Sequence, residues 1–215
     1  MKRLHHLAIP LALLAISSPA LAQEASLEKG ILAELNRVRA DPHAYAMKLR
    51  AYRNLIDADG VRHDPGDPVG KVTFEGTASV DEAIAALEAQ APLPPLEMDS
   101  ELAKVAQAYA AEQGRTGGFG HVSADGTSMP GRISHGRAMY GAFAETISYG
   151  ERTAADVVRQ LVVDDGVPDR GHRQILFAAG LNYVGIGCGV HVRYEFECVE
   201  DYSSMTAPPV LAMAR

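Results

Sequence analysis

The most constraining feature of this chain is a segment near its C-terminus in which apolar residues alternate with glycine. Residues 183–190 read Tyr-Val-Gly-Ile-Gly-Cys-Gly-Val. In a β-strand, successive side chains point to opposite faces, so one face of this segment carries only glycine. Such a bare face allows a helix or another backbone to pack closely against the strand. A nucleotide-binding glycine loop has a different spacing and is followed by a helix, so we interpret the segment as a strand.

A second strand is expected directly after the first. Residues 194–202 are rich in aromatic side chains, and a short turn near His191–Glu195 would join the two strands into a hairpin. If Val190 faces Phe196 across the hairpin, Cys188 lies opposite Cys198 on the same face. The alternatives to a disulfide are two buried thiols or half of a metal site, but cysteines ten positions apart lack a zinc-ribbon spacing. We therefore expect a disulfide between Cys188 and Cys198.

The N-terminus has the pattern of a secretory signal peptide. Two basic residues precede an apolar stretch over residues 7–16, and Ala20-Leu21-Ala22 fits a cleavage site. An uncleaved membrane anchor is the alternative, but the apolar stretch is short and contains a proline. We expect residues 1–22 to be removed and residues 23–215 to be exported to a periplasm or secreted, with no transmembrane segment after cleavage. An oxidising compartment favours the disulfide.

The rest of the chain reads as helices separated by turn-rich segments. Apolar residues recur at helical spacing from Leu27 to Val38, and Asp41-Pro42 is expected to end that helix. Residues 57–78 carry many Gly, Pro and Asp residues and read as an irregular insertion. Further helices are expected at three capping residues, namely Ser79, Ser100 and Thr153. Helices followed by a terminal antiparallel hairpin predict an α+β fold in a single domain.

The composition excludes several classes of function. The chain has 215 residues, 22% of them charged, and a formal net charge of −7. Nucleic-acid binding requires clustered Lys and Arg, so a nucleic-acid partner is not expected. The sequence contains no His-Glu-x-x-His helix, no Gly-x-Ser-x-Gly elbow and no P-loop.

Two histidines in turn-rich segments are candidates for a site. His121 and His172 each follow a glycine, Glu145 lies between them in a partly apolar segment, and Asp164 and Asp165 follow an apolar helix face. Imidazoles and carboxylates can bind a divalent ion, with water completing the shell. They can equally hydrogen-bond to one another. Their spacings match no short metal-binding motif, so the residues alone leave both interpretations open.

Five segments occur in an order that carries a family resemblance. They are Leu35-Asn-Arg-Val-Arg39 with Asp41-Pro42, Gly120-His121 with Asp125-Gly126, Ala144-Glu-Thr-Ile147 with Gly150, residues 164–173, and residues 184–189. Together they resemble the CAP superfamily, which comprises cysteine-rich secretory proteins, antigen 5 and plant pathogenesis-related proteins of the first class. The chain looks most like the bacterial secreted branch. The resemblance extends from about residue 27 to residue 203.

The resemblance implies both a fold and a site. Family members have a three-layer α-β-α sandwich with a central antiparallel sheet, and a surface cleft lined by two histidines and two acidic residues. Matched residue by residue, His121 and His172 are the histidines and Glu145 is one of the acids. Asp164 is the second acid, chosen over its neighbour Asp165.

The chain departs from the family pattern at single residues and in one long segment, and Asp164 in place of glutamate would shorten the reach of the acid by one methylene. Thr146 and Gln174 stand where related proteins usually have asparagine, which changes hydrogen-bond partners beside the matched acid and histidine. The stretch from residue 53 to residue 93 is long compared with the smallest members. We interpret it as an insertion within a single CAP-like domain over residues 23–215, placed where it could cover part of the cleft.

Three functions are compatible with the resemblance. The leading hypothesis is a non-enzymatic module that binds a divalent metal ion such as zinc through His121 and His172, or a small or lipid ligand in the same cleft. The alternative is a metal-assisted hydrolase of peptides or envelope material, with Glu145 as general base to an ion-bound water. The third is a protein-interaction domain that uses residues 57–78 as an exposed surface.

Overall fold

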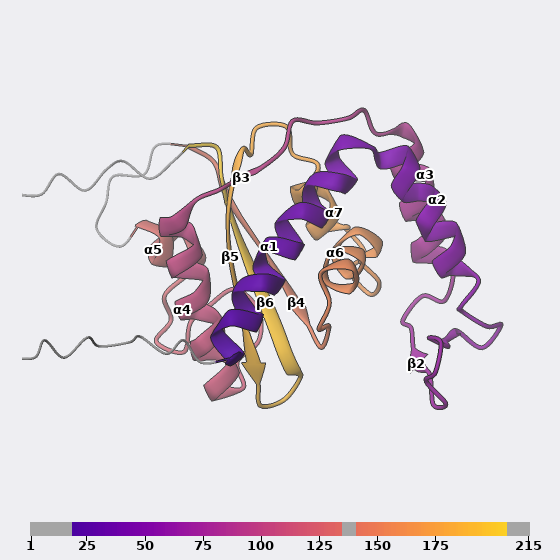
Figure 1. The fold of residues 1–215 in the computed structure, drawn as a ribbon, viewed down its shortest axis with the longest axis horizontal. Coiled ribbons are helices and arrows are strands. Elements are labelled where there is room, and N and C mark those ends of the chain that lie inside the picture. The colour runs from indigo at the N-terminus through magenta and orange to yellow at the C-terminus, as the bar shows by residue number, and fades with distance from the viewer. Residues whose placement is uncertain (1–18, 135–140, 206–215) are drawn as a thin grey trace, which may run out of the picture.

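The computed structural model describes residues 19–134 and 141–205, with side chains from residue 26 onward (Figure 1). Within these residues, no helix is long and apolar enough to cross a membrane. The predicted signal peptide lies outside the described residues, apart from residues 19–22, which belong to helix α1 (Pro19–Ala40).

The centre of the molecule is a β-sheet whose strands come from distant parts of the chain. The described strands of this sheet lie in the order β3 (Glu97–Met98), β5 (Tyr183–His191), β6 (Glu195–Ser203) and β4 (Phe143–Tyr149). β5 and β6 form the predicted antiparallel hairpin, and β4 pairs antiparallel with β6. Only the short β3 runs parallel to its neighbour, β5. The sheet is therefore antiparallel throughout its long strands.

The two cysteines lie opposite each other in the hairpin. Cys188 of β5 is the register partner of Cys198 of β6, and the two sulfur atoms are bonded at 2.10 Å. Both residues are fully buried. The predicted disulfide is confirmed, and it cross-links the two inner strands of the sheet.

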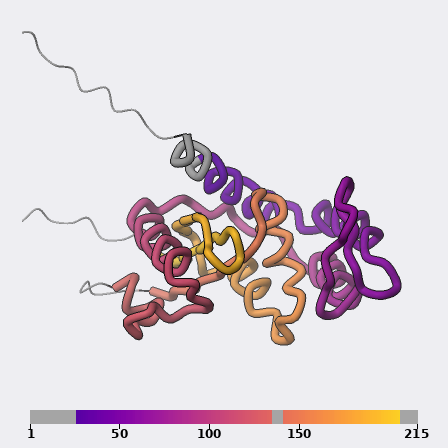
Figure 2. The backbone as a smooth tube through the Cα atoms, turned by 90° about the horizontal axis from the view of Figure 1, so that it is seen from below, coloured from indigo at the N-terminus to yellow at the C-terminus, as the bar shows by residue number. Residues whose placement is uncertain are grey.

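Helices cover both faces of the sheet, as Figures 1 and 2 show. Helix α4 (Ser100–Thr116) packs on one face, mainly against β5 and β6. Helices α1, α6 (Ala154–Val163) and α7 (Gly171–Leu176) lie on the other. Buried apolar side chains fill both interfaces, with the larger cluster under α1 and α6. The predicted α+β class and three-layer sandwich are confirmed.

The glycine face of β5 packs against a helix, as the sequence predicted, at two of its three glycines. A Cβ atom added at Gly185 or Gly187 would overlap the backbone of α4, at Ala103 and Gln107 respectively. At Gly189 the same atom would meet nothing within 4 Å. The first two glycines therefore let α4 lie directly on the sheet, whereas the third is not required for packing.

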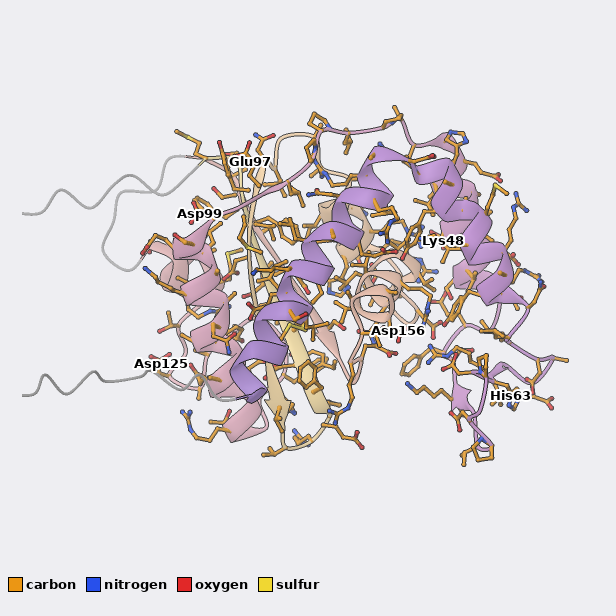
Figure 3. The ribbon with its side chains drawn as sticks, in the orientation of Figure 1. Lys48, His63, Glu97, Asp99, Asp125 and Asp156 are labelled. Carbon is orange, nitrogen blue, oxygen red and sulfur yellow. A yellow bond between two sulfur atoms is a disulfide. The ribbon has the colours of Figure 1, made fainter. Side chains whose placement is uncertain are left out.

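The helix starts show how local the capping signals are. Thr153 caps α6 through its side chain, as predicted. Helix α4 is capped by the carboxylate of Asp99 (Figure 3), so the prediction of Ser100 is wrong by one residue. Helix α3 (Ala78–Ala89) begins after Thr77, so the prediction of a capping box at Ser79 is also wrong.

The predicted insertion over residues 53–93, together with the segment before it, contains more regular structure than the sequence suggests. Helix α2 (Pro42–Arg53) was not predicted, and the carboxylate of Asp41 caps it, so Asp41-Pro42 both ends α1 and begins α2. Between α2 and α3 lies a small antiparallel hairpin, β1 (Val61–Arg62) and β2 (Lys71–Val72). α2 and α3 pack on each other at the end of the molecule away from α4 (Figure 1).

Candidate functional site

His121 and Glu145 form the first of two histidine–acid pairs. His121 follows the turn that closes α4, in which Gly117 and Gly120 adopt positive φ angles. Glu145 lies on β4 and its side chain is buried, whereas the His121 side chain is 50% exposed. The imidazole Nδ1 lies 2.8 Å from the Glu145 Oε1 atom. The strand thus holds an internal carboxylate beneath a ring at the surface.

The second oxygen of Glu145 is also occupied. Arg132, from helix α5 (Met129–Ser134), donates from Nη2 to Glu145 Oε2 at 2.5 Å. The same guanidinium donates to the His121 carbonyl oxygen at 3.0 Å and lies over the Tyr109 ring, 3.3 Å from its centroid. Arg132 therefore fixes both members of the pair, and the sequence analysis did not single it out.

His172 and Asp164 form the second pair. Asp164 ends α6 in a left-handed conformation, with φ of 58°, and its carboxylate is buried. Asp164 Oδ1 lies 2.6 Å from His172 Nδ1, and Oδ2 accepts a hydrogen bond from the His172 backbone N–H. The His172 side chain is 23% exposed. The carboxylate thus orients the ring and satisfies the backbone at the start of α7.

Asp165 has a different role from its neighbour. Its carboxylate accepts hydrogen bonds from the backbone N–H groups of Phe74 and Glu75, at 2.8 and 3.0 Å, and from the Ser79 hydroxyl. All three donors belong to the insertion. Asp164 therefore contacts the histidine, whereas Asp165 holds the insertion against the loop that carries the histidine.

Arg170 makes a second connection between that loop and the insertion. Its guanidinium forms a two-pronged ion pair with Glu75 and a further pair with Glu82 on α3. These partners raise the pKa of Arg170, and the guanidinium lowers the pKa of Glu75 to about 2. Arg170 itself has a positive φ of 54° immediately before α7. The insertion thus braces the loop on which His172 lies.

The two histidine–acid pairs share one geometry. In each pair Nδ1 faces a carboxylate, which can only accept when ionised, so the ring donates its Nδ1–H. The Nε2 atom of a neutral ring then carries the free lone pair. Within residues 26–134 and 141–205, no hydrogen bond to Nε2 of His121 or His172 is found. Both rings therefore present Nε2 to a hydrogen-bond donor or a metal ion.

The four matched residues form two separate hydrogen-bonded pairs, His121 with Glu145 and His172 with Asp164. Among the residues it describes, no three His, Cys, Asp or Glu side chains are placed to hold one metal ion together. Both carboxylates already bind their histidines through the oxygens that a metal would use. Among these four side chains, the two Nε2 atoms are therefore the ones left for a metal ion.

Strand β6 carries three buried acids that the sequence analysis missed. Burial raises the pKa of Glu197 and of Glu200 to about 8. Asp201 lies directly across from Glu145, and burial together with that carboxylate raises the pKa of Asp201 well above its ordinary value. A protonated Asp201 adds no second negative charge beside Glu145. The signal available in the sequence was acidic residues within a strand that otherwise belongs to the core.

The two residues that replace the family's asparagines, Thr146 and Gln174, each form a side-chain hydrogen bond. The hydroxyl of Thr146 donates to Glu200 Oε2 at 2.7 Å, inside the core. The side chain of Gln174 donates to the Asp169 carbonyl oxygen. Neither residue contacts a matched histidine, so the two substitutions leave the histidine–acid pairs in place.

Comparison with known proteins assigns the fold to a family. The family model described as "Cysteine-rich secretory protein family", CAP, matches residues 32–202. The chain belongs to the CAP family. No similar sequence was found among curated proteins.

Solved structures of bacterial proteins resemble this CAP chain at low identity. An outer surface protein of Borrelia burgdorferi is 22% identical over 52% of this chain and 78% of its own, with a TM-score of 0.44. An extracellular protein with an SCP domain from Bacillus anthracis is 19% identical over 60% of this chain and 38% of its own, with a TM-score of 0.40. A cysteine-rich secretory protein from Staphylococcus aureus is 16% identical over 57% of this chain and 35% of its own, with a TM-score of 0.39.

Proposed function

We propose that this chain is an exported, non-enzymatic CAP module whose histidine–acid cleft binds a divalent cation such as zinc. The observation that carries the proposal is the shared geometry of the two pairs. Each buried carboxylate orients an accessible imidazole through Nδ1, and a carboxylate in that position makes the opposite nitrogen a better metal ligand. His121 and His172 would supply the two protein ligands, and Glu145 and Asp164 would orient them.

The limited number of protein ligands sets the expected strength of binding. A structural zinc site has four protein ligands, and catalytic sites usually have three. Two imidazoles with water in the remaining positions form an open and weaker site. We therefore expect reversible zinc binding that depends on both histidines.

The position of Glu145 argues against the hydrolase hypothesis. A general base must lie within hydrogen-bond reach of the water that it activates. Both Glu145 oxygens are already occupied, one by the imidazole of His121 and the other by the guanidinium of Arg132. A peptide-library digest with added zinc tests this point. We expect no cleavage by the wild-type protein. Cleavage by the wild type that is lost in Glu145→Gln would instead support the hydrolase hypothesis.

Export is the second part of the proposal. The buried disulfide between Cys188 and Cys198 fits an oxidising compartment, and the N-terminal pattern fits a cleaved signal peptide. Fusion of residues 1–30 to a reporter that is active only outside the cytoplasm tests this assignment. The lipid ligand and the protein-interaction role of residues 57–78 stay predictions.

A zinc titration of the mature, untagged protein tests the cation site. We expect saturable binding by the wild type and at least about tenfold weaker binding by His121→Ala and by His172→Ala, because one ion needs both rings. The matched control is His43→Ala, since His43 is an exposed histidine on α2. Its binding should equal that of the wild type. Equal binding by the wild type and the double variant His121→Ala/His172→Ala would refute the proposal.

A further inference from the structure

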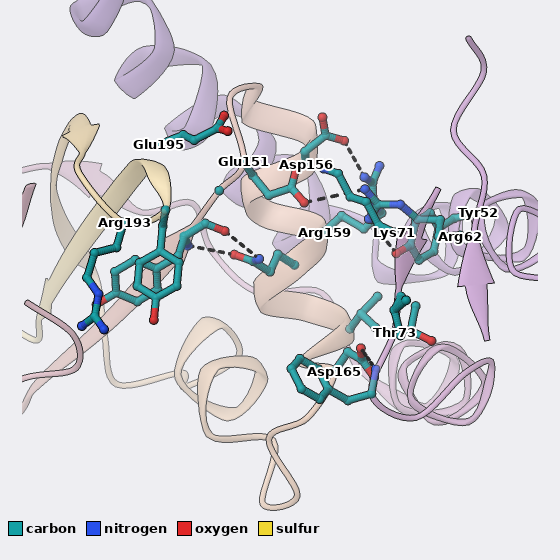
Figure 4. Close-up of a pocket in the computed structure, with 17 residues that line it drawn as sticks. Tyr52, Arg62, Lys71, Thr73, Glu151, Asp156, Arg159, Asp165, Arg193 and Glu195 are labelled. Carbon is teal, nitrogen blue, oxygen red and sulfur yellow. Dashed lines mark hydrogen bonds and ion pairs between the residues drawn. The ribbon is translucent and has the colours of Figure 1, made fainter. Parts of the chain in front are cut away.

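A cavity lies between the insertion and the sandwich (Figure 4). Its volume is about 490 Å³, within the range of small-molecule sites. The β2 strand of the insertion lines one side of the cavity, one face of α6 along the length of the helix lines the middle, and the turn between β5 and β6 lines the other side. None of the four matched residues lines it. The insertion thus supplies one side of the cavity, and the sandwich supplies the rest.

The charged lining of the cavity is balanced. Its cationic side chains are Arg62, Lys71, Arg159 and Arg193. Its acidic side chains are Glu151, Asp156, Asp165 and Glu195. An anionic ligand would meet the carboxylates and a cationic ligand would meet the cations, so neither gains from the lining as a whole. This balance favours a neutral ligand that can both donate and accept hydrogen bonds.

Glu151 lies at a point where such a ligand fits. Its carboxylate is 3.8 Å from Arg62 Nη2 and 3.8 Å from Lys71 Nζ, distances too long for a hydrogen bond. The Glu151 side chain is only 12% exposed, and the described residues provide its carboxylate with no closer partner. A hydroxyl group placed beside either ion pair would donate to the carboxylate and accept from the cation, bridging the two. The gap is therefore suited to a hydroxylated ligand.

The two cations are held together by the hairpin. Arg62 and Lys71 are direct register partners in β1 and β2, an arrangement in which like charges repel. Arg62 is neutralised by Asp64 at 2.8 Å, whereas the Lys71 side chain is 52% exposed and, within the described residues, pairs with Glu151 at 3.8 Å. The ammonium group of Lys71 is thus available to a molecule in the cavity.

Aromatic side chains stand at both ends of the cavity. Phe74 is 87% exposed at the insertion, and Tyr194 is 38% exposed at the β5–β6 turn. Apolar C–H faces of a sugar ring pack on such rings. A peptide added as a strand is disfavoured, because the side chain of Gln160 already bonds the backbone N–H and carbonyl of Tyr149 at the end of edge strand β4.

We infer that this cavity is a binding site for a neutral carbohydrate. Sugar hydroxyls bridge Glu151 to Lys71 and Arg62, and the sugar ring packs against Tyr194 or Phe74. The site is independent of the histidine–acid cleft, so it requires no metal ion.

Ligand titration with neutral oligosaccharides tests the inference. The probes are the tetramers of N-acetylglucosamine, glucose in α-1,4 linkage and glucose in β-1,4 linkage, and tetra-alanine is the peptide probe. Saturation-transfer NMR with the folded mature protein reports binding, with a chelator present to remove metal ions. We expect at least one sugar to bind, and Lys71→Met and Glu151→Met to weaken it by at least about tenfold.

The matched control is Lys104→Met on α4, which also removes an exposed lysine engaged in one ion pair. Lys104→Met should bind the sugar as the wild type does, and thermal melting verifies that each variant is folded. Tyr194→Ala, at the opposite end of the cavity, provides a second test if a hairpin variant fails to fold. Binding of none of the three sugars, binding of tetra-alanine alone, or sugar binding unaffected by these cavity substitutions would overturn the inference.

Discussion

At the scale of single residues, the buried carboxyl groups of β6 make the stability of this protein depend on pH. Glu200 is fully buried, and Thr146 donates one hydrogen bond to it. Burial raises the pKa of Glu200 to about 8, above the value of an exposed glutamate. Between these two pKa values the folded state binds more protons than the unfolded state. The free energy of unfolding therefore falls as pH rises through this window.

Glu200→Gln should remove that dependence. The amide keeps the shape and cannot ionise, so the variant should gain stability relative to wild type by roughly 1 to 3 kcal/mol between pH 5 and pH 8. Urea unfolding at the two pH values measures this difference. A constant difference between the two proteins at both pH values would contradict the account.

Two glycines of β5 offer a matched test of close packing. Gly187→Ala places a Cβ into the backbone of α4, whereas Gly189→Ala places one in open space. We expect Gly187→Ala to lower the free energy of unfolding by roughly 2 to 4 kcal/mol and Gly189→Ala to leave it within about 0.5 kcal/mol. Equal effects in denaturant melts would show that the alternation of glycine does not serve the packing of α4.

At the scale of elements, the insertion is held to the loop of His172 by a few long-range contacts. Asp165 accepts three hydrogen bonds from the insertion, from residues about ninety positions earlier in the chain. Asp165→Ala should therefore increase amide hydrogen exchange in residues 73–79 by at least about tenfold, with the sheet unaffected. Asp59→Ala, which removes an exposed carboxylate of the same insertion, is the control. Unchanged amide hydrogen exchange in residues 73–79 of Asp165→Ala would show that Asp165 does not hold the insertion in place.

The same elements show what local sequence can predict. Thr153 was identified because its side chain and the apolar face that follows it are adjacent in sequence. Asp99 and Ser100 are both good capping residues, and only the extended backbone of Asp99 decides between them. Helix α2 was missed because Asp41-Pro42 is a stop signal as well as a start signal. The insertion is held in place by hydrogen bonds to Asp165, which lies about ninety residues later in the chain. A local sequence pattern cannot predict a contact between residues so far apart.

In the candidate site, too, the sequence predicted some residues and missed others that depend on long-range contacts. The resemblance placed His121, Glu145 and His172 together with an acid at Asp164, and the structure gives each histidine its acid. Arg132 was not found, because an arginine in a short helix carries no pattern that links it to a strand. The buried acids of β6 were missed because strand alternation normally assigns acidic residues to a solvent face.

At the scale of the whole molecule, the disulfide ties together the two central strands. Cys188 and Cys198 close a loop of ten residues in sequence separation. Loop-closure entropy predicts that reduction lowers the free energy of unfolding by roughly 3 kcal/mol. Urea unfolding with and without a thiol reductant measures this effect. An identical midpoint in the oxidised and reduced protein would mean that packing alone fixes the hairpin.

The central claim is that His121 and His172 present Nε2 to one shared ion. Nitrogen-detected NMR of the imidazole rings during a zinc titration tests this claim most directly. The account predicts that the Nε2 resonances of both rings shift together and saturate at one zinc per protein, while each Nδ1 stays protonated. Shifts that saturate independently, or no shift of either ring, would contradict it.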